Sequence, residues 1–409
     1  MSPFLQLTFA LAMIIALAKL GSYLSFRLGH PAVLGELLVG VLLGPSILDF
    51  LHLSIFTDQH LQEVIQELAE LGVMLLMFLA GLELHISELL KSSKVAILAG
   101  VLGVLFPLAL GAGGGVLFAL TPKNALFLGL TLAATSVSIS AQTLIELNRL
   151  RSKIGFGLLG AAVFDDILVV LGLSVFTALA MPELGERSGF TMILIVLLRM
   201  VIFLFLSSAI GYFLFPPMAL KIFSLEISQG LISFVFVTIL LFGWLADVLG
   251  KMAAITGAFL AGLWFARTAL KERILSGIST IAYGVFVPIF FVDVGLNANV
   301  RSLFGGDFWL FLGLFLIAVV GKVLGVALGA LLSGDYSPLE ALELGVGMMS
   351  RGEVGLIVAS VGISEGFLTA ASFSAIVGVV VATTLLTPPL LRYLVQREPG
   401  RARVFAEGE

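Results

Sequence analysis

The chain has no cysteine and very few charged residues for its length. The absence of cysteine excludes disulfide bonds and thiolate chemistry. Only 12% of the 409 residues are charged, whereas a soluble domain carries about 25%, and 59% are hydrophobic. Because the deficit of charge extends along the whole chain, we expect a protein whose solvent is mostly lipid.

Other absences exclude several classes of function. The net charge of -4 provides no basic surface for nucleic acid. The glycine run at residues 111–115 is not followed by the Lys-Ser/Thr of a phosphate-binding loop. The four histidines fall in predicted loops or at span ends, which excludes a zinc site or a histidine relay inside the membrane. We therefore expect neither a cofactor nor an enzymatic activity.

What the chain does contain is a series of long apolar runs. A helix needs about 20 apolar residues to cross the hydrocarbon core of a membrane. Thirteen such runs cover residues 4–27, 31–48, 63–84, 94–120, 123–147, 154–180, 190–215, 227–247, 252–268, 276–294, 307–333, 338–363 and 370–394. They are continuous, without the period-two alternation of barrel strands. The first lacks the basic region and cleavage site of a signal peptide. The sequence predicts an all-α integral membrane protein with about 13 spans.

The basic residues predict the orientation of these spans, because cytoplasmic loops carry an excess of Lys and Arg. One set of connecting segments and the C-terminal tail holds fourteen basic residues, and the other set holds four. This bias places the N-terminus outside and the C-terminus in the cytoplasm of a cell with a plasma or inner membrane.

Three short stretches recur at nearly constant offsets. Residues 34–40 resemble 256–262, residues 81–89 resemble 295–303, and residues 125–129 resemble 341–345, at offsets of 222, 214 and 216. Each pair lies seven predicted spans apart, so the partner helices run in opposite directions. Inverted repeats are typical of secondary transporters, which bind substrate near the midplane where the halves meet. The repeat therefore favours alternating access over a simple channel.

The sixth predicted span carries two adjacent acids, Asp165 and Asp166, in an otherwise apolar stretch. An ionisable residue at this depth is a functional candidate because burying it is costly. Adjacent residues point about 100° apart around a helix axis, so the two acids have different neighbours and different roles. In the eleventh span, Lys322 is too deep for easy contact with the membrane surface, and we expect it to pair with one of these acids. The flanking Gly321 and Gly325 allow another helix to approach closely.

Two further polar stretches lie at matching places of the repeat. Hydroxyls cluster in the fifth span at Thr135, Ser136, Ser138 and Ser140, and the twelfth span carries Ser350-Arg351-Gly352-Glu353. Paired polar interruptions of this kind predict two broken helices that cross near the midplane. Their freed carbonyls are suited to binding a cation. Ser138, Arg351 and Glu353 are expected to support the broken helix ends, and a structural role for them is as consistent with the sequence as contact with a substrate.

These residues together resemble a known family. The Thr135-Ser-Val-Ser138 stretch, the Asp165-Asp166 pair, Lys322 and Arg351-Gly-Glu-Val354 are similar to motifs of the bacterial monovalent cation:proton antiporter-2 family, especially its NapA type with the NhaA-like fold. The resemblance covers essentially the whole chain. It implies a homodimer with a core at about 94–180 and 307–394. The dimerisation panel would be about 1–90 and 190–294. Because only a short tail follows the last predicted span, no soluble regulatory domain is expected.

The resemblance also implies roles for the site residues. Asp166 would be the main Na+ and proton site, with Asp165 and Thr135 completing the Na+ site and Ser136 nearby. Asp165 would pair with Lys322, which couples charge to transport. The implied function is electrogenic exchange of Na+ or Li+ for H+. A K+/H+ antiporter and a Na+-coupled solute symporter on the same fold stay open as alternatives, whereas an aspartyl protease would need its two acids on separate helices.

Overall fold

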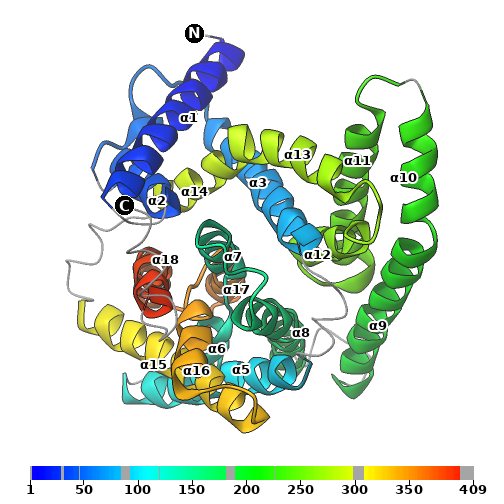
Figure 1. Cartoon of the computed structure of the whole chain (residues 1–409). Coiled ribbons are helices and arrows are strands. Elements are labelled where there is room, and N and C mark those ends of the chain that lie inside the picture. The colour runs from blue at the N-terminus through cyan, green and yellow to red at the C-terminus, as the bar shows by residue number, and fades with distance from the viewer. Residues whose placement is uncertain are drawn as a thin grey trace. The chain divides into compact units, whose positions relative to one another are not determined.

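The structure is a computed structural model of the whole chain (Figure 1). It describes all residues except 1, 29–31, 46, 84–92, 119, 181–188, 226, 298–307 and 397–409. Within the described helices, the side chains of residues 170, 174, 177–180, 189–190, 192–193, 353, 357, 360, 364 and 370 are also left out.

The described residues form helices and connecting segments, with no strand among them. They divide into two compact units. Unit 1 comprises residues 1–16, 51–91 and 166–293, and unit 2 comprises residues 17–50, 92–165 and 294–409. The boundary divides two long helices, α1 (Pro3–Arg27) and α8 (Lys153–Ala180).

Unit 1 contains most of the helices from the middle of the chain. These are α3 (Leu61–Glu83), α9 (Gly189–Phe213), α10 (Phe215–Ser224), α11 (Gly230–Leu245), α12 (Ala254–Phe265), α13 (Lys271–Ile281) and nearly all of α14 (Val287–Leu296), with π-helical turns at Ala246–Gly250 and Ala282–Phe286. The second half of α8 also belongs to this unit. Its Ile167 and Leu171 pack against a buried cluster that includes Met200 and Phe203 of α9.

Unit 2 contains the helices that follow the other apolar runs. They are α2 (Ala32–Leu43), α5 (Ser93–Leu117), α6 (Pro122–Ala133), α7 (Val137–Glu146), α15 (Phe308–Ser333), α16 (Pro338–Gly347), α17 (Glu353–Ser364) and α18 (Ala370–Gln396). Helices α5 and α15 pack closely, as the glycines of the eleventh span predicted. A Cβ atom on Gly325 would lie only 2.3 Å from the Leu102 carbonyl oxygen of α5.

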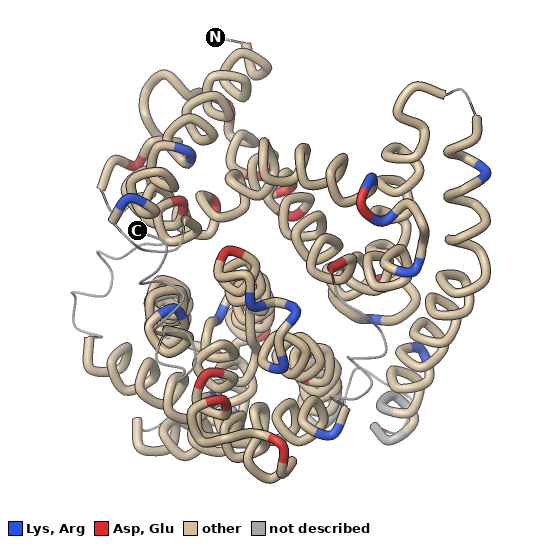
Figure 2. The backbone as a smooth tube through the Cα atoms, in the orientation of Figure 1, with Lys and Arg blue, Asp and Glu red and all other residues tan. Residues whose placement is uncertain are grey.

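The predicted apolar runs agree with these helices. In the described part of the chain, ten helical stretches are long and apolar enough to cross a membrane, and three shorter apolar helices accompany them. Figure 2 shows how far the tube runs between charged residues. The all-α prediction is confirmed, whereas the number of thirteen crossings stays a prediction. The short helix α10 was not predicted, because its sequence lies between two of the apolar runs.

A partly buried acid, Glu146, joins two segments of unit 2. Glu146, the last residue of α7, accepts hydrogen bonds from the backbone N–H groups of Ala32 and Val33, at 2.6 and 3.2 Å. These groups lack partners within α2 because they belong to its first turn. The end of α7 is therefore joined to the start of α2.

The division into a core and a dimerisation panel concerns movement and assembly, and stays a prediction.

The helix boundaries repeat as the sequence repeats do. Helices α2 and α12 start at Ala32 and Ala254, which reproduces the offset between the first pair of repeat stretches. The starts of α6 and α16, and those of α7 and α17, both reproduce the offset of the third pair. The same supersecondary order therefore occurs twice in the chain.

Candidate functional site

Two helical segments of unit 2 are interrupted in the middle. Helix α6 ends at Ala133 and α7 begins at Val137, and the three residues between them are not helical. Helix α16 ends at Gly347 and α17 begins at Glu353. Each interruption leaves carbonyl groups at the end of the first helix without intrahelical donors. Both predicted broken helices are thus present, at the predicted hydroxyl and Ser-Arg-Gly-Glu stretches.

The two interruptions touch each other. The Ser136 N–H donates to the Ser350 carbonyl oxygen at 2.9 Å, and the Ser350 hydroxyl donates to the Ser136 carbonyl oxygen at 2.6 Å. Both residues are fully buried. The close approach requires a glycine, because a Cβ atom on Gly352 would lie 2.5 Å from the Ser136 Cβ atom. The extended segments between the half-helices therefore cross at Ser136 and Ser350.

The two broken helices run in opposite directions through unit 2. At the start of α6, the Lys123 ammonium group lies 4.7 Å from the ring centroid of Phe367, which follows α17. At the other end, Lys153 follows α7 and its ammonium group bonds to Glu340, in the first turn of α16, at 3.0 Å. One broken helix thus begins where the other ends, which is the arrangement that an inverted repeat requires.

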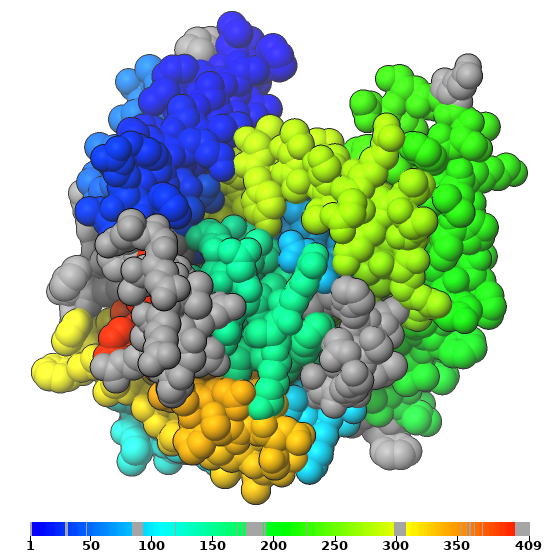
Figure 3. Space-filling model, viewed as in Figure 1, coloured from blue at the N-terminus to red at the C-terminus, as the bar shows by residue number. Residues whose placement is uncertain are grey.

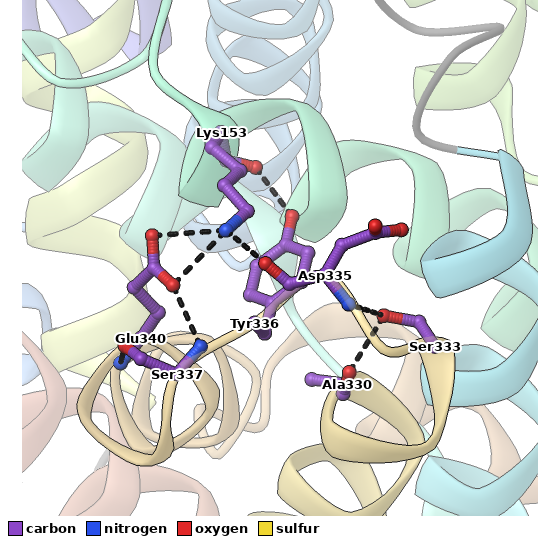
Figure 4. A network of polar contacts seen from close by, with 7 residues as sticks. All are labelled: Lys153, Ala330, Ser333, Asp335, Tyr336, Ser337 and Glu340. Carbon is purple, nitrogen blue, oxygen red and sulfur yellow. Dashed lines mark hydrogen bonds and ion pairs between the residues drawn. The ribbon is translucent and has the colours of Figure 1, made fainter.

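A network of hydrogen bonds connects Lys153, which follows α7, to the residues at the start of α16 (Figure 4). The Lys153 ammonium group donates to both carboxylate oxygens of Glu340 and to the Asp335 carbonyl oxygen. The Tyr336 hydroxyl donates to the Lys153 carbonyl oxygen at 2.7 Å. Burial raises the pKa of Tyr336, and the nearby carboxylates of Glu340 and Asp335 raise it further, so its hydroxyl stays a donor. The start of α16, orange in Figure 3, adjoins the teal segment around the start of α8 at the surface.

Lys322 of α15 pairs with Asp165 of α8 in the interior of unit 2. Its ammonium group donates to Asp165 Oδ1, and also to the Ala133 carbonyl oxygen at the end of α6, at 3.0 Å. Both side chains are completely buried. The residue pattern alone left open which of the two adjacent acids faces the lysine, the family resemblance implied Asp165, and in the structure it is Asp165.

Arg351 lies in the second interruption and reaches across to the first. One guanidinium nitrogen donates to the Ala134 carbonyl oxygen at 2.9 Å and to the Thr135 hydroxyl at 3.3 Å, and the other donates to the Ala318 carbonyl oxygen of α15 at 3.0 Å. The Ala133 carbonyl oxygen is also within reach, at 3.4 Å. A helix C-terminus carries a partial negative charge, which a cation stabilises. The end of α6 is therefore neutralised by two buried cations, Arg351 and Lys322.

The predicted hydroxyl residues line the crossing and bond to one another. The Ser136 and Ser138 hydroxyls are 3.0 Å apart, and the Ser140 hydroxyl donates to the Gly347 carbonyl oxygen at the end of α16. Ser136 and Ser138 are fully buried, and Thr135 is nearly so. The side chain of Glu353 lies outside the described residues.

Asp166 has different surroundings from its neighbour. It belongs to unit 1, where its carboxylate accepts a hydrogen bond from the Thr256 hydroxyl of α12 at 3.4 Å. It is partly exposed, whereas Asp165 is completely buried. The two adjacent acids thus have separate partners, as their angular separation predicted.

Sequence reasoning missed several participants. Thr256 was noted only as part of a repeat, and Glu146 was not noticed because it lies at a span end. Thr383 and Thr384 of α18 bond to the backbone of Arg351 and were also missed. The signal that could have found the last two is a pair of adjacent hydroxyls in an apolar span, the same signal that drew attention to Thr135 and Ser136.

An all-helical chain of apolar spans, with two oppositely directed broken helices crossing beside a buried ion pair, defines a multi-pass membrane transporter. The chain belongs to the family of transmembrane sodium/hydrogen exchangers, whose family model matches residues 12–397.

Individual relatives agree with this assignment. The chain is 39% identical over 386 residues to the Na+/H+-K+ antiporter GerN of Bacillus cereus, covering 94% of this chain and 95% of that protein. It is 37% identical over 389 residues to a Na+/H+ antiporter of Enterococcus hirae, covering 95% and 97%. Its fold resembles that of the sodium proton antiporter MjNhaP1 of Methanocaldococcus jannaschii, with a TM-score of 0.69 and 18% identity over 96% of this chain and 99% of that one.

Proposed function

We propose that this protein exchanges Na+ for H+ across the membrane by alternating access. The relatives named above as Na+/H+ antiporters support the substrates. The observation that carries the proposal is the completely buried Lys322–Asp165 pair at the end of α6. Two oppositely directed broken helices beside such a pair provide a site at which ion binding can change the charge balance.

The charges of this cluster suggest how the ions are coupled. Lys322 and Arg351 contribute two positive charges, Asp165 contributes one negative charge, and the end of α6 contributes about half a negative charge. The cluster therefore has an excess of positive charge that favours release of a proton when another cation arrives. In the proposed cycle Na+ binds at Asp166, the neighbouring residue in α8, and Lys322 loses its proton as the Asp165 pair loosens.

Competition at Asp166 accounts for exchange. Its carboxylate holds either Na+ or a proton, and the bare charge is costly to move through the apolar barrier. Asp165 and Thr135 complete the proposed Na+ site with Ser136 beside it, and Thr135 must first release its contact with Arg351. No cofactor enters this cycle, since Na+ and H+ are both substrates. If two protons move per Na+, one net charge crosses, and a potential of 100 mV contributes about 2.3 kcal/mol.

Potassium is the second candidate substrate. The relative from Bacillus cereus carries K+ as well as Na+ in its name. Carboxylate, hydroxyl and carbonyl oxygens are hard ligands that suit alkali cations in general, so the residues present do not distinguish Na+, Li+ and K+. We propose Na+ as the main substrate because both relatives carry it in their names.

The proposed setting is a homodimer in the plasma membrane or inner membrane, of the NapA type, with the N-terminus outside. The segments around Lys94, Lys153 and Ser333, which are all assigned to the cytoplasm, lie together in unit 2, as the Lys153 network and the 2.5 Å bond from Lys94 to the Ser333 carbonyl oxygen illustrate. Their proximity supports the prediction that successive loops alternate between the two sides of the membrane. The excess of basic residues then identifies this side as the cytoplasmic one.

The test is exchange by purified protein in liposomes that contain a pH-sensitive dye. Addition of Na+ or Li+ to acid-loaded liposomes should move protons through the wild type, and Asp166→Asn should reduce this flux to that of protein-free liposomes. Asp247→Asn is the matched control, because Asp247 is an exposed acid in an apolar helical stretch and should retain exchange.

The results of this assay distinguish Na+/H+ exchange at Asp166 from the alternative functions. Wild-type exchange by Asp166→Asn would show that the site is assigned wrongly. A wild type that responds to K+ but not Na+ would favour the second candidate. Na+-dependent uptake of an organic solute without proton movement would replace the antiporter by a symporter.

A further inference from the structure

Two adjacent threonines of α18 hydrogen-bond to the backbone of one residue in the second broken helix, Arg351. The Thr383 hydroxyl accepts a hydrogen bond from the Arg351 N–H group at 3.1 Å, and the Thr384 hydroxyl donates to the Arg351 carbonyl oxygen at 2.8 Å. Thr383 and Thr384 are both buried, with exposed fractions of 0% and 1%. Both the N–H and the carbonyl group of Arg351 are therefore hydrogen-bonded to α18.

The backbone of Arg351 needs these partners. It lies between the end of α16 at Gly347 and the start of α17 at Glu353, so helical bonds do not satisfy its N–H and carbonyl groups. Buried backbone groups without partners are costly.

A second observation concerns position in the repeat. Thr383 lies as far beyond the start of α18 at Ala370 as Asp166 lies beyond the start of α8 at Lys153. At this register the Thr383 hydroxyl takes the place of the Asp166 carboxylate, whereas the counterpart of Asp165 is Ala382.

The side chain of the same arginine reaches the end of α6. Its guanidinium group shares the Ala133 carbonyl oxygen with Lys322, at 3.4 and 3.0 Å respectively. Lys322 in turn holds Asp165. A displacement of the Arg351 backbone therefore changes how the α6 carbonyls are divided between the two cations.

We propose that Thr383 and Thr384 are positioning residues for the ion-coupling cluster: by holding the Arg351 backbone, they set how much of the α6 carbonyl charge is left for Lys322. The inference rests on the proposed antiport function and adds a specific role for α18. Among the contacts given for the described residues, the charged groups beside Lys322 are Asp165 from α8 and Arg351 from the second interruption. When Arg351 withdraws, the α6 carbonyls hold the protonated lysine more strongly, and Na+ must compete against a cation that leaves less readily.

The variant that tests this is Thr384→Val, which keeps the shape of the side chain and removes the donor. The apparent KM for Na+ should rise roughly fivefold to tenfold, the factor that one buried hydrogen bond of this kind is worth. The pH profile of Na+-driven proton flux should move to higher pH, because Lys322 keeps its proton longer. Thr384→Ser retains the hydroxyl and should restore both values.

The matched control is Thr387→Val. Thr387 lies on the same helix, is equally buried, and donates to the Thr383 carbonyl oxygen of its own helix at 2.7 Å. It has no contact with Arg351 among the bonds described. Its variant should keep the wild-type KM and pH profile. A double-mutant cycle adds a second readout, because in the Arg351→Gln background Thr384→Val should have no further effect on KM.

The measurement is the liposome assay described above, preceded by size-exclusion chromatography of each variant. Equal effects of Thr384→Val and Thr387→Val on KM and pH profile would overturn the inference, as would additive effects in the cycle. If Thr384→Val does not fold, Thr384→Ala is compared with Thr384→Ser. If the alanine variant also fails to fold while Thr387→Val folds, a purely structural role is indicated and the inference is wrong. A wild type without exchange would contradict the proposed function instead.

Discussion

In both broken helices of unit 2, carbonyl groups at the end of the first half-helix need hydrogen-bond donors from outside that helix. The two helix ends differ in whether these donors are charged or neutral. At the end of α6, carbonyl groups accept hydrogen bonds from the charged groups of Lys322 and Arg351. At the end of α16, the Gly347 carbonyl oxygen accepts from the neutral Ser140 hydroxyl. The N–H groups of Met348 and Met349 turn back onto the last carbonyls of α16.

This difference arises within a repeat whose helices begin at matching positions. At the offset that relates α6 to α16 and α7 to α17, Arg351 is the counterpart of Thr135. These two counterparts contact each other, since the guanidinium group donates to the Thr135 hydroxyl at 3.3 Å. The repeat therefore provides two similar frames, and a few substitutions within them surround the end of α6 with charged groups and the end of α16 with a neutral one. Because each of these helix ends lies at the point where the two segments cross, we call the end of α6 the charged crossing and the end of α16 the neutral crossing. The charged crossing is the one beside Asp165, where ion coupling is proposed.

The largest expected effect comes from removing a cation at the charged crossing. Lys322→Met leaves Asp165 buried without its ammonium partner, which should lower the free energy of unfolding by about 3–5 kcal/mol near neutral pH. Thermal unfolding in detergent measures this loss. Lys322→Met combined with Asp165→Asn should recover much of it, because no buried charge is left uncompensated. Lys221→Met, at an exposed position of α10, is the control. A loss as small as that of the control would contradict the charged crossing.

The next effect concerns the contact between the two crossings. Gly352→Ala places a methyl group 2.5 Å from the Ser136 Cβ atom, so one segment must move. We expect a loss of about 1–3 kcal/mol in the free energy of unfolding. Gly113→Ala in α5 is the control, because a Cβ atom there meets nothing within 4 Å, and it should be neutral or stabilising. If the two variants unfold at the same temperature, the crossing is looser than the contact of Ser136 with Gly352 indicates.

A smaller effect is expected at the neutral crossing. Ser140→Ala removes the donor to the Gly347 carbonyl oxygen and should cost about 1–3 kcal/mol, the usual range for leaving one buried acceptor unpaired. The same unfolding assay compares it directly with Lys322→Met. The comparison between the crossings predicts that the lysine variant loses more stability, and the reverse order would refute it. Thr143→Val, which removes a hydroxyl bonded to its own helix, serves as the reference for loss of a buried hydroxyl.

The smallest effect is expected at the end of the broken helices, away from both crossings. Lys153 and Glu340 form an ion pair in which the side chains are 41% and 24% exposed. Exposed pairs contribute about 0–1 kcal/mol and weaken with salt. Glu340→Gln should therefore change the unfolding temperature slightly, and the difference from wild type should shrink as NaCl is raised. A large difference in unfolding temperature that does not depend on salt would mean that this ion pair contributes as much to stability as the contacts at the crossings, and would contradict the prediction.

The sequence predicted the elements well because lipid imposes simple rules on them. Continuous apolar runs predicted the helices, and α2, α12 and α10 show where the rule weakens, since short or amphipathic segments carry less signal. The broken helices were predicted from hydroxyl and charged stretches at matching places. Their partners were not, because a residue such as Thr384 has the same appearance in sequence as Thr387, whose hydrogen bond among the described residues lies within its own helix.

The sequence by itself determined that the protein is all-helical and which of its ionisable residues are deep in apolar spans, because both follow from the cost of exposing polar groups to lipid. The residue pattern alone did not decide that Lys322 faces Asp165, the partner implied by the family resemblance, or that Arg351 turns toward the end of α6; the tertiary structure brings both contacts about. Those choices join residues 157 and 217 positions apart. Local composition does not encode such pairs, because the packing of distant helices selects which side of each helix faces the other.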